Sequence, residues 1–184
     1  MKFTFSIFVL FFSMCALYAQ EVSFDAIYEK DGLTYIKGSN ELFTGKVVAF
    51  YPNGKKSLEI EYKNGIESGT NRNWYANGNI ANETQIDSSK IDGLWIDYYP
   101  NGVKQNEVTY ETDYMNGPCV RRYENGNISE EGSYAHCREE GLWKYYWENG
   151  NKKAEGYYHE ASKTGEWKYW DEQGKESATE IPVK

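Results

Sequence analysis

The stretch "GLWKYYWENGNKKAEGYY", from Gly141 to Tyr158, places an Asn-Gly pair between two aromatic, β-prone runs. Asn-Gly in this setting is the strongest short signal for a β-hairpin, because both residues tolerate the positive φ of a type I′ turn. If the pair forms a two-residue loop, Trp143 lies opposite Gly156, and Gly141 lies opposite Tyr158. The stretch is therefore predicted to be an antiparallel hairpin.

The same pattern recurs along the chain with a period of 24 residues. Each block opens with a glycine, and a second glycine follows nine residues later, preceded by Asn in five of the six blocks. The opening glycines are Gly45, Gly69, Gly93, Gly117, Gly141 and Gly165. Five blocks also carry a glutamate fourteen residues after this glycine. Residue types that recur at equivalent positions of six blocks, with a constant period, indicate tandem structural units.

These units predict an all-β fold: an elongated, twisted, open antiparallel sheet built from tandem 24-residue β-hairpin repeats. Each hairpin is expected to pack against its neighbours in the chain. The expected divisions are 1–19 (signal peptide), 20–44 (lead-in strands or cap), 45–174 (repeats 45–68, 69–92, 93–116, 117–140, 141–164 and a partial 165–174) and 175–184 (tail or cap).

Alternation along the strands divides the aromatic residues between two faces. The hairpin register sets large side chains opposite small or β-branched ones: Trp95 opposite Val108, Cys119 opposite Gly132, and Val47 opposite Ile60. We expect one face to be a core in which rings lie over glycine backbone. The other face is the candidate interaction surface. It comprises Phe50, Trp74, Tyr98, Tyr146 and Trp170, with Glu83, Glu107 and Glu155.

The motif G-x-W-x-x-Y-Y-x-N-G followed by E-x-x-Y appears as "GLWIDYYPNGVKQNEVTY" and in the stretch quoted first. It resembles the MORN-repeat variant family, whose bacterial members are often labelled antitoxin-like. The resemblance covers about Phe43 to Gly174, preceded by lead-in strands over residues 32–46. It implies an open sheet of successive hairpins that is used for interaction rather than for chemistry.

The N-terminus has the order of a secretory signal peptide: one cation, a short apolar run and the small residue Ala19. We expect cleavage after Ala19, no membrane segment in the mature chain, and a periplasmic, outer-membrane-associated or secreted protein. Lipidation of Cys15 is not expected, because Met14 replaces the small residue that would precede it.

The formal net charge of −8 disfavours nucleic acid and anionic lipid as partners, since both need basic patches. A partner protein with a basic or neutral surface is expected instead, and a glycan is an alternative ligand.

No catalytic residue, cofactor or metal site is expected. The sequence has no nucleophile–base motif and no phosphate-binding glycine loop. His136, Cys137 and His159 lack a second close pair of ligands for zinc. A Cys119–Cys137 disulfide is not expected either, because the register separates the two residues. The chain is therefore interpreted as a protein without enzyme activity.

The leading hypothesis is an exported, non-enzymatic protein-interaction module, with an antitoxin- or immunity-like activity as its particular form. Two alternatives stay open at this point. The aromatic and glutamate side chains could bind carbohydrate, or the repeats could form a structural spacer in the cell envelope.

Overall fold

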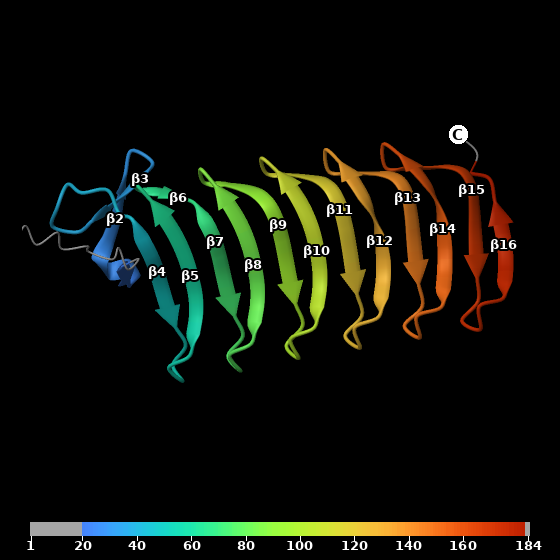
Figure 1. The fold of residues 1–184 in the computed structure, drawn as a ribbon, viewed down its shortest axis with the longest axis horizontal. Coiled ribbons are helices and arrows are strands. Elements are labelled where there is room, and N and C mark those ends of the chain that lie inside the picture. Colours follow the sequence, from blue (N-terminus) through green and yellow to red (C-terminus); the bar gives the residue numbers. More distant parts are fainter. Residues whose placement is uncertain (1–19, 183–184) are drawn as a thin grey trace, which may run out of the picture.

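The structure is a computed structural model that describes residues 20–182, so the expected signal peptide and Cys15 lie outside the described residues. It is an all-β chain with one 3-10 turn, η1 (Phe24–Ala26) (Figure 1). The strands are β1 (Gln20–Val22), β2 (Ile27–Lys30), β3 (Leu33–Ile36), β4 (Gly45–Phe50), β5 (Lys56–Lys63), β6 (Ile66–Glu67), β7 (Gly69–Trp74), β8 (Ile80–Asp87), β9 (Lys90–Tyr98), β10 (Lys104–Glu111), β11 (Tyr114–Arg122), β12 (Ile128–Ala135), β13 (Arg138–Tyr146), β14 (Lys152–His159), β15 (Ser162–Trp170) and β16 (Glu176–Glu180).

One 14-stranded sheet runs the length of the molecule, with its strands in chain order from β4 to β16 except for the short β6, which pairs only with β5. All its pairs are antiparallel except β1, which pairs with β4 in parallel. Strands β2 and β3 form a separate two-stranded sheet at the N-terminal end (Figure 1). The predicted fold class, an elongated open sheet of tandem hairpins, is confirmed.

The predicted hairpin register is also confirmed. The paired residues are Val47 with Ile60, Trp95 with Val108, Cys119 with Gly132, Trp143 with Gly156, and the opening glycines Gly93, Gly117 and Gly141 with Tyr110, Tyr134 and Tyr158.

The predicted type I′ turn at Asn-Gly is wrong. In the first repeat, the backbone N–H of Tyr51 donates to Lys55 and that of Gly54 donates to Tyr51, which closes a three-residue loop. Gly54 has φ +80°, whereas Asn53 is not in the left-handed region. A type I turn followed by a left-handed glycine has this form. The longer loop would shift the register, but a β-bulge between Ala49 and Phe50 restores it.

Type I′ geometry is found at the opposite edge of the sheet, in the turns that join one repeat to the next. After the first repeat this turn is Asn64-Gly65, with φ values of 52° and 78°. The later two-residue turns are Ser88-Ser89, Thr112-Asp113, His136-Cys137 and Glu160-Ala161, and their φ values lie between 49° and 69°. Non-glycine residues are disfavoured there by about 1–2 kcal/mol each. The strands on both sides must therefore impose this conformation.

Gly141 shows that an opening glycine need not lie under an aromatic ring. Gly141 has φ +75° and open space where a Cβ would lie, so no ring packs on it. It lies in the β12–β13 pairing, where the register shifts between Glu131 and Ser133. A glycine is needed at this bulge for its backbone conformation.

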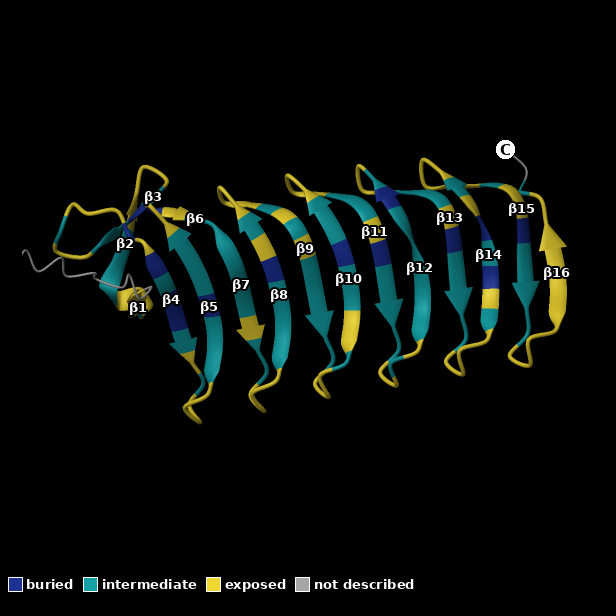
Figure 2. Ribbon diagram, viewed as in Figure 1, coloured by how far each residue is buried: buried dark blue, intermediate teal, exposed yellow. Residues whose placement is uncertain are grey.

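Rings do lie over glycine backbone at two other positions. The indole of Trp143 covers Gly132, and that of Trp167 covers Gly156; both indoles are 1% exposed. The edge of Tyr134 also meets Trp143, with 5.2 Å between ring centroids. The core is thus a line of side chains along the middle of the strands, which Figure 2 shows as the buried band.

Candidate functional site

The Asn-Gly turns form one long edge of the sheet, here called the tip edge (lower edge in Figure 1). At each turn, the asparagine Nδ2 donates to a backbone carbonyl of the next repeat 23 residues on, and Oδ1 accepts the N–H two residues on. The donating residues are Asn53, Asn77, Asn101, Asn125 and Asn149. Asparagine is therefore required for bonding between repeats, not for a positive φ. Gln173 stands at this position in the block that opens at Gly165.

A second series of bonds joins the same repeats. The hydroxyl groups of Tyr75, Tyr99 and Tyr123 each donate to the backbone carbonyl 23 residues on, at 2.6–2.8 Å. Trp147 uses its indole N–H in the same way, at 3.0 Å from the carbonyl of Trp170. These two series fix neighbouring hairpins to each other.

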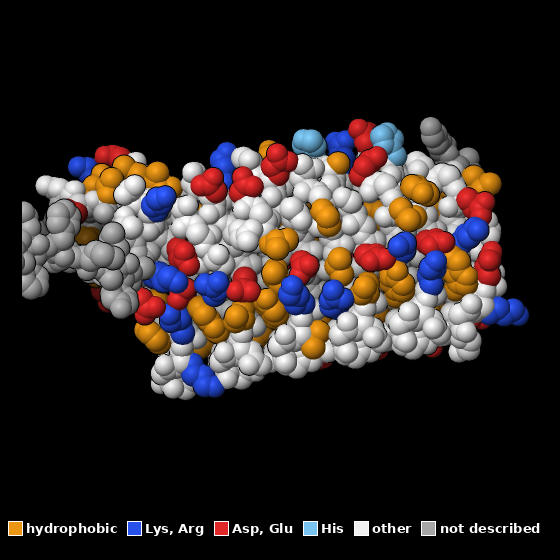
Figure 3. All heavy atoms as spheres, viewed as in Figure 1, with side chains coloured by type: hydrophobic (Ala, Val, Ile, Leu, Met, Phe, Trp, Pro, Cys, Tyr) orange, Lys and Arg blue, Asp and Glu red, His pale blue; other side chains and the backbone are white. Residues whose placement is uncertain are grey.

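The predicted interaction residues share one face of the sheet, here called the charged face. It carries Phe50, Trp74, Tyr98, Tyr146 and Trp170 and the glutamate column Glu59, Glu83, Glu107, Glu131 and Glu155. Figure 3 shows acidic and basic side chains alternating in a band along this face, with hydrophobic side chains beside the band. Phe50 is 58% exposed, and the other four aromatic residues are partly buried.

Internal bonds occupy part of this aromatic column. Tyr98 donates to Glu83 and Tyr146 to Glu131, each at 2.8 Å. Burial and this hydrogen bond raise the pKa of Tyr98 to about 12. Lys152 Nζ lies 4.9 Å from the ring centroid of Trp170. These contacts fix the side chains of Tyr98, Tyr146 and Trp170, so the aromatic part of the charged face is a preorganised surface.

Every member of the glutamate column has a cationic partner. Glu83 accepts from Arg72 at 2.8 Å, and Glu155 accepts from Lys152 at 2.7 Å. Glu107 pairs with Lys104. The direct cross-strand partners of Glu107, Ile96 and Val120, are uncharged. The missing cation comes from three residues earlier on the same strand. These carboxylates are engaged internally, which weakens their assignment as acceptors for sugar hydroxyls.

The pKa of Glu83 lies below its usual range. Burial alone would raise it, but the hydrogen bonds from Arg72 and Tyr98 outweigh that effect. For Glu131 the hydrogen bond from Tyr146 is the largest cause of the lowered pKa. These hydrogen bonds therefore favour the charged forms of Glu83 and Glu131.

Sequence reasoning missed the exposed apolar part of the charged face. Leu142 and Tyr157 are direct cross-strand partners and are 40% and 55% exposed. Leu94, 37% exposed, precedes Leu142 by two repeats. Two shallow hollows, one between β11 and β13 and one between β13 and β15, share Leu142 in their walls. The signal was available, since Leu94 and Leu142 lie four residues before Tyr98 and Tyr146 on the same strands and so share their face.

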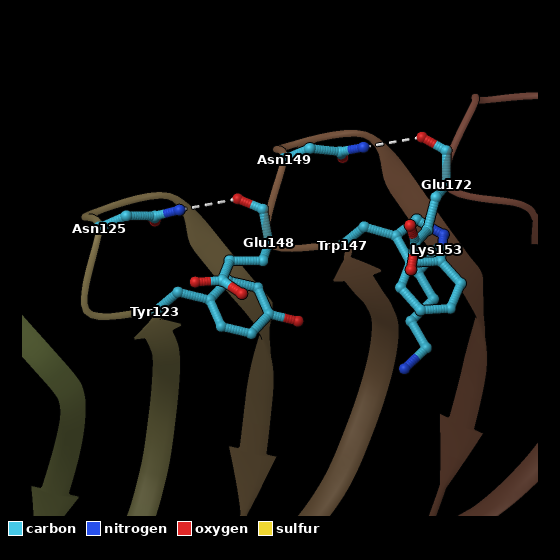
Figure 4. A pocket seen from close by; sticks show the side chains of 7 residues that line it. All are labelled: Tyr123, Asn125, Trp147, Glu148, Asn149, Lys153 and Glu172. Atoms are coloured by element: carbon cyan, nitrogen blue, oxygen red, sulfur yellow. Dashed lines mark hydrogen bonds between the residues drawn. The ribbon is translucent and has the colours of Figure 1, made fainter.

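A groove of larger volume lies at the tip edge (Figure 4). It has a volume of about 570 Å³ and is lined by the rings of Tyr123 and Trp147, by Glu148 and Glu172, and by Lys153. Figure 4 shows these side chains beneath two hydrogen bonds of successive turns, from Asn125 to the backbone of Glu148 and from Asn149 to the backbone of Glu172. None of these residues was a predicted site residue.

The cysteine and histidine residues within the described range are the candidates for a metal or disulfide site. Cys119 is buried, Cys137 is exposed, and no disulfide joins them. Burial raises the pKa of Cys119 to about 11. His159 Nδ1 lies 3.0 Å from a carboxylate oxygen of Glu140. Within residues 20–182, no cluster of three side chains is placed to hold a metal ion, and no helix has the length and apolar character to cross a membrane.

Comparison with known families assigns the repeats. The profile of the MORN repeat variant matches residues 43–64, 91–112, 115–136 and 139–160. The chain is a MORN-variant repeat protein. The blocks that open at Gly69 and Gly165 have no match, and the Gly69 block has Asn71 at the position of Trp95 and Trp143. No curated protein matches the chain.

Proposed function

We propose that this MORN-variant protein is an exported, non-enzymatic interaction module whose charged face binds a partner protein. MORN-variant repeats are consistent with an interaction module. One observation carries the proposal: Leu142 and Tyr157 lie side by side and exposed on a face that no other element in residues 20–182 covers. Exposed apolar side chains with a polar surround are typical of protein-binding sites.

The chemistry of the face supports a protein rather than a charged polymer as the partner. Its carboxylates are matched by lysine and arginine along the sheet, so it offers little net charge. Aromatic residues held in place by Glu83 and Glu131 lose little entropy on binding. An apolar patch with such anchors fits a neutral, partly apolar protein surface.

An antitoxin- or immunity-like activity is the specific form of this function that the family resemblance suggests. In that form the bound protein is harmful to the cell and is inactivated by the charged face. Export then requires that the harmful protein also acts in the envelope or outside the cell.

The experiment uses the purified protein as bait on envelope and secreted fractions of its source cells. Leu142→Asp combined with Tyr157→Ser should abolish retention of one specific partner while circular dichroism stays unchanged. Tyr114→Ser is the matched control, because Tyr114 is 57% exposed but lies beside an inter-repeat turn. A partner that is retained equally by both variants would place the binding surface elsewhere.

A further inference from the structure

The tip-edge groove, with a volume of about 570 Å³, is not part of the charged face. Two aromatic rings, Tyr123 and Trp147, lie in it one repeat apart. Glu148 and Glu172 follow these rings at the same spacing of 25 residues, so each ring has a carboxylate from the next repeat in the same groove (Figure 4). The charge of Glu148 contributes to the raised pKa of Tyr123, second to burial, which is consistent with their proximity.

The groove already holds one cation. Lys153 Nζ lies 4.4 Å from the ring centroid of Trp147. A cation over an aromatic face is attracted by the ring quadrupole, and nearby carboxylates strengthen this attraction. The equivalent residue of the preceding repeat is Ser129, and among residues 20–182 no lysine or arginine lies over the ring of Tyr123. One ring therefore has a cation from its own chain, and the other does not.

We infer that this groove binds a lysine- or arginine-rich segment of a partner protein, with basic side chains at every third residue. Charge complementarity supports this occupant, because Glu148 and Glu172 outnumber Lys153 in the groove and the whole chain has a net charge of −8. The inference rests on the proposed interaction function and names the chemistry of a second contact.

The repeat spacing determines the spacing of the basic residues. The two rings are two strands apart, which is roughly 9.6 Å at the usual strand separation. A segment in the polyproline II conformation has three residues per turn and rises about 3.1 Å per residue. Side chains three residues apart then point the same way at about 9.3 Å, which matches the two ring positions.

Fluorescence anisotropy with labelled peptides tests the inference. The probe is Lys-Ser-Pro repeated four times, and the comparison peptide has the same composition with the lysines irregularly spaced. The regular peptide should bind more tightly to the purified protein, and binding should weaken as salt rises. Equal affinity for the two peptides would overturn the spacing argument.

Variants of the groove make the test specific. Glu148→Gln combined with Glu172→Gln should weaken binding clearly more than Glu111→Gln combined with Glu139→Gln, which changes the net charge equally away from the groove. Lys153→Ser should strengthen binding about two- to fivefold, because it frees the Trp147 ring. Lys175→Ser is the control for that change in charge. Groove variants that behave like their controls would refute the site.

The charged-face variant, Leu142→Asp with Tyr157→Ser, should leave peptide binding unchanged. If the peptide does not bind but this variant still loses the native partner, the groove inference fails and the proposed function stands. If the peptide binds and the variant retains the native partner, the charged face is refuted instead.

Discussion

Replacing Gly132 with alanine tests the packing of rings on glycine backbone. The added Cβ would lie 2.7 Å from Cγ of Trp143 and closer still to other ring atoms, against a usual carbon–carbon contact of about 3.5–4.0 Å. Trp143 has little freedom to move, because it is 1% exposed and its indole N–H donates to Ser133 at 3.2 Å. Overpacking of this kind is destabilising by about 1–3 kcal/mol, and alanine in a strand recovers about 0.5–1 kcal/mol relative to glycine.

Because several ring atoms of Trp143 would clash with the added Cβ, the overpacking cost lies near the upper end of its range. The expected net loss is then about 2 kcal/mol in the free energy of unfolding, measured by urea denaturation and far-ultraviolet circular dichroism. The same substitution in a Trp143→Leu background should be neutral or stabilising, because the clash is gone and Gly132 does not have a positive φ. A Gly132→Ala protein as stable as the parent would refute the reasoning. So would an equal loss in both backgrounds.

Three further predictions concern the turns and the charged face. Asn125→Ala should lower stability by about 1 kcal/mol through loss of its bonds to Glu148 and Asn127, whereas Gln173→Ala should have no effect; equal urea midpoints would contradict this. Ala161→Gly should raise stability by about 1 kcal/mol, because φ is +64° there, and a lower melting temperature would count against the turn assignment. The lowered pKa of Glu83 stabilises the fold above the unfolded value of about 4.3. This contribution is lost as pH falls through the folded pKa, so Glu83→Gln should flatten the acid limb of stability against pH; an unchanged limb would exclude the effect.

The sequence was sufficient for the strand register but not for the turn geometry. The prediction assumed a two-residue Asn-Gly loop, and the three-residue loop with the compensating bulge between Ala49 and Phe50 leads to the same pairing. Asn-Gly favours both turn types, so local chemistry could not distinguish them. The asparagine has another role, because it donates a hydrogen bond to a backbone carbonyl of the next repeat. That carbonyl lies 23 residues further along the chain, so the local sequence of the turn does not show the contact.

The candidate site was predictable in part. Alternation placed Tyr98 and Tyr146 on one face correctly, because the two-residue period of a strand is rigid. It could not predict that Glu83 and Glu131 accept their hydroxyl bonds, which run diagonally between repeats. The groove at Trp147 was also missed, since it is formed by turns that belong to different blocks.

Site-specific photocrosslinking tests the central claim, that the charged face binds a partner protein, most directly. A photoreactive residue is placed at Tyr157 on this face and, as the reference, at Tyr114 beside an inter-repeat turn, and both proteins are irradiated in the source cells. The account predicts one dominant crosslinked protein from position 157 and none from position 114. The same protein crosslinked equally from both positions, or no protein from position 157, would contradict it.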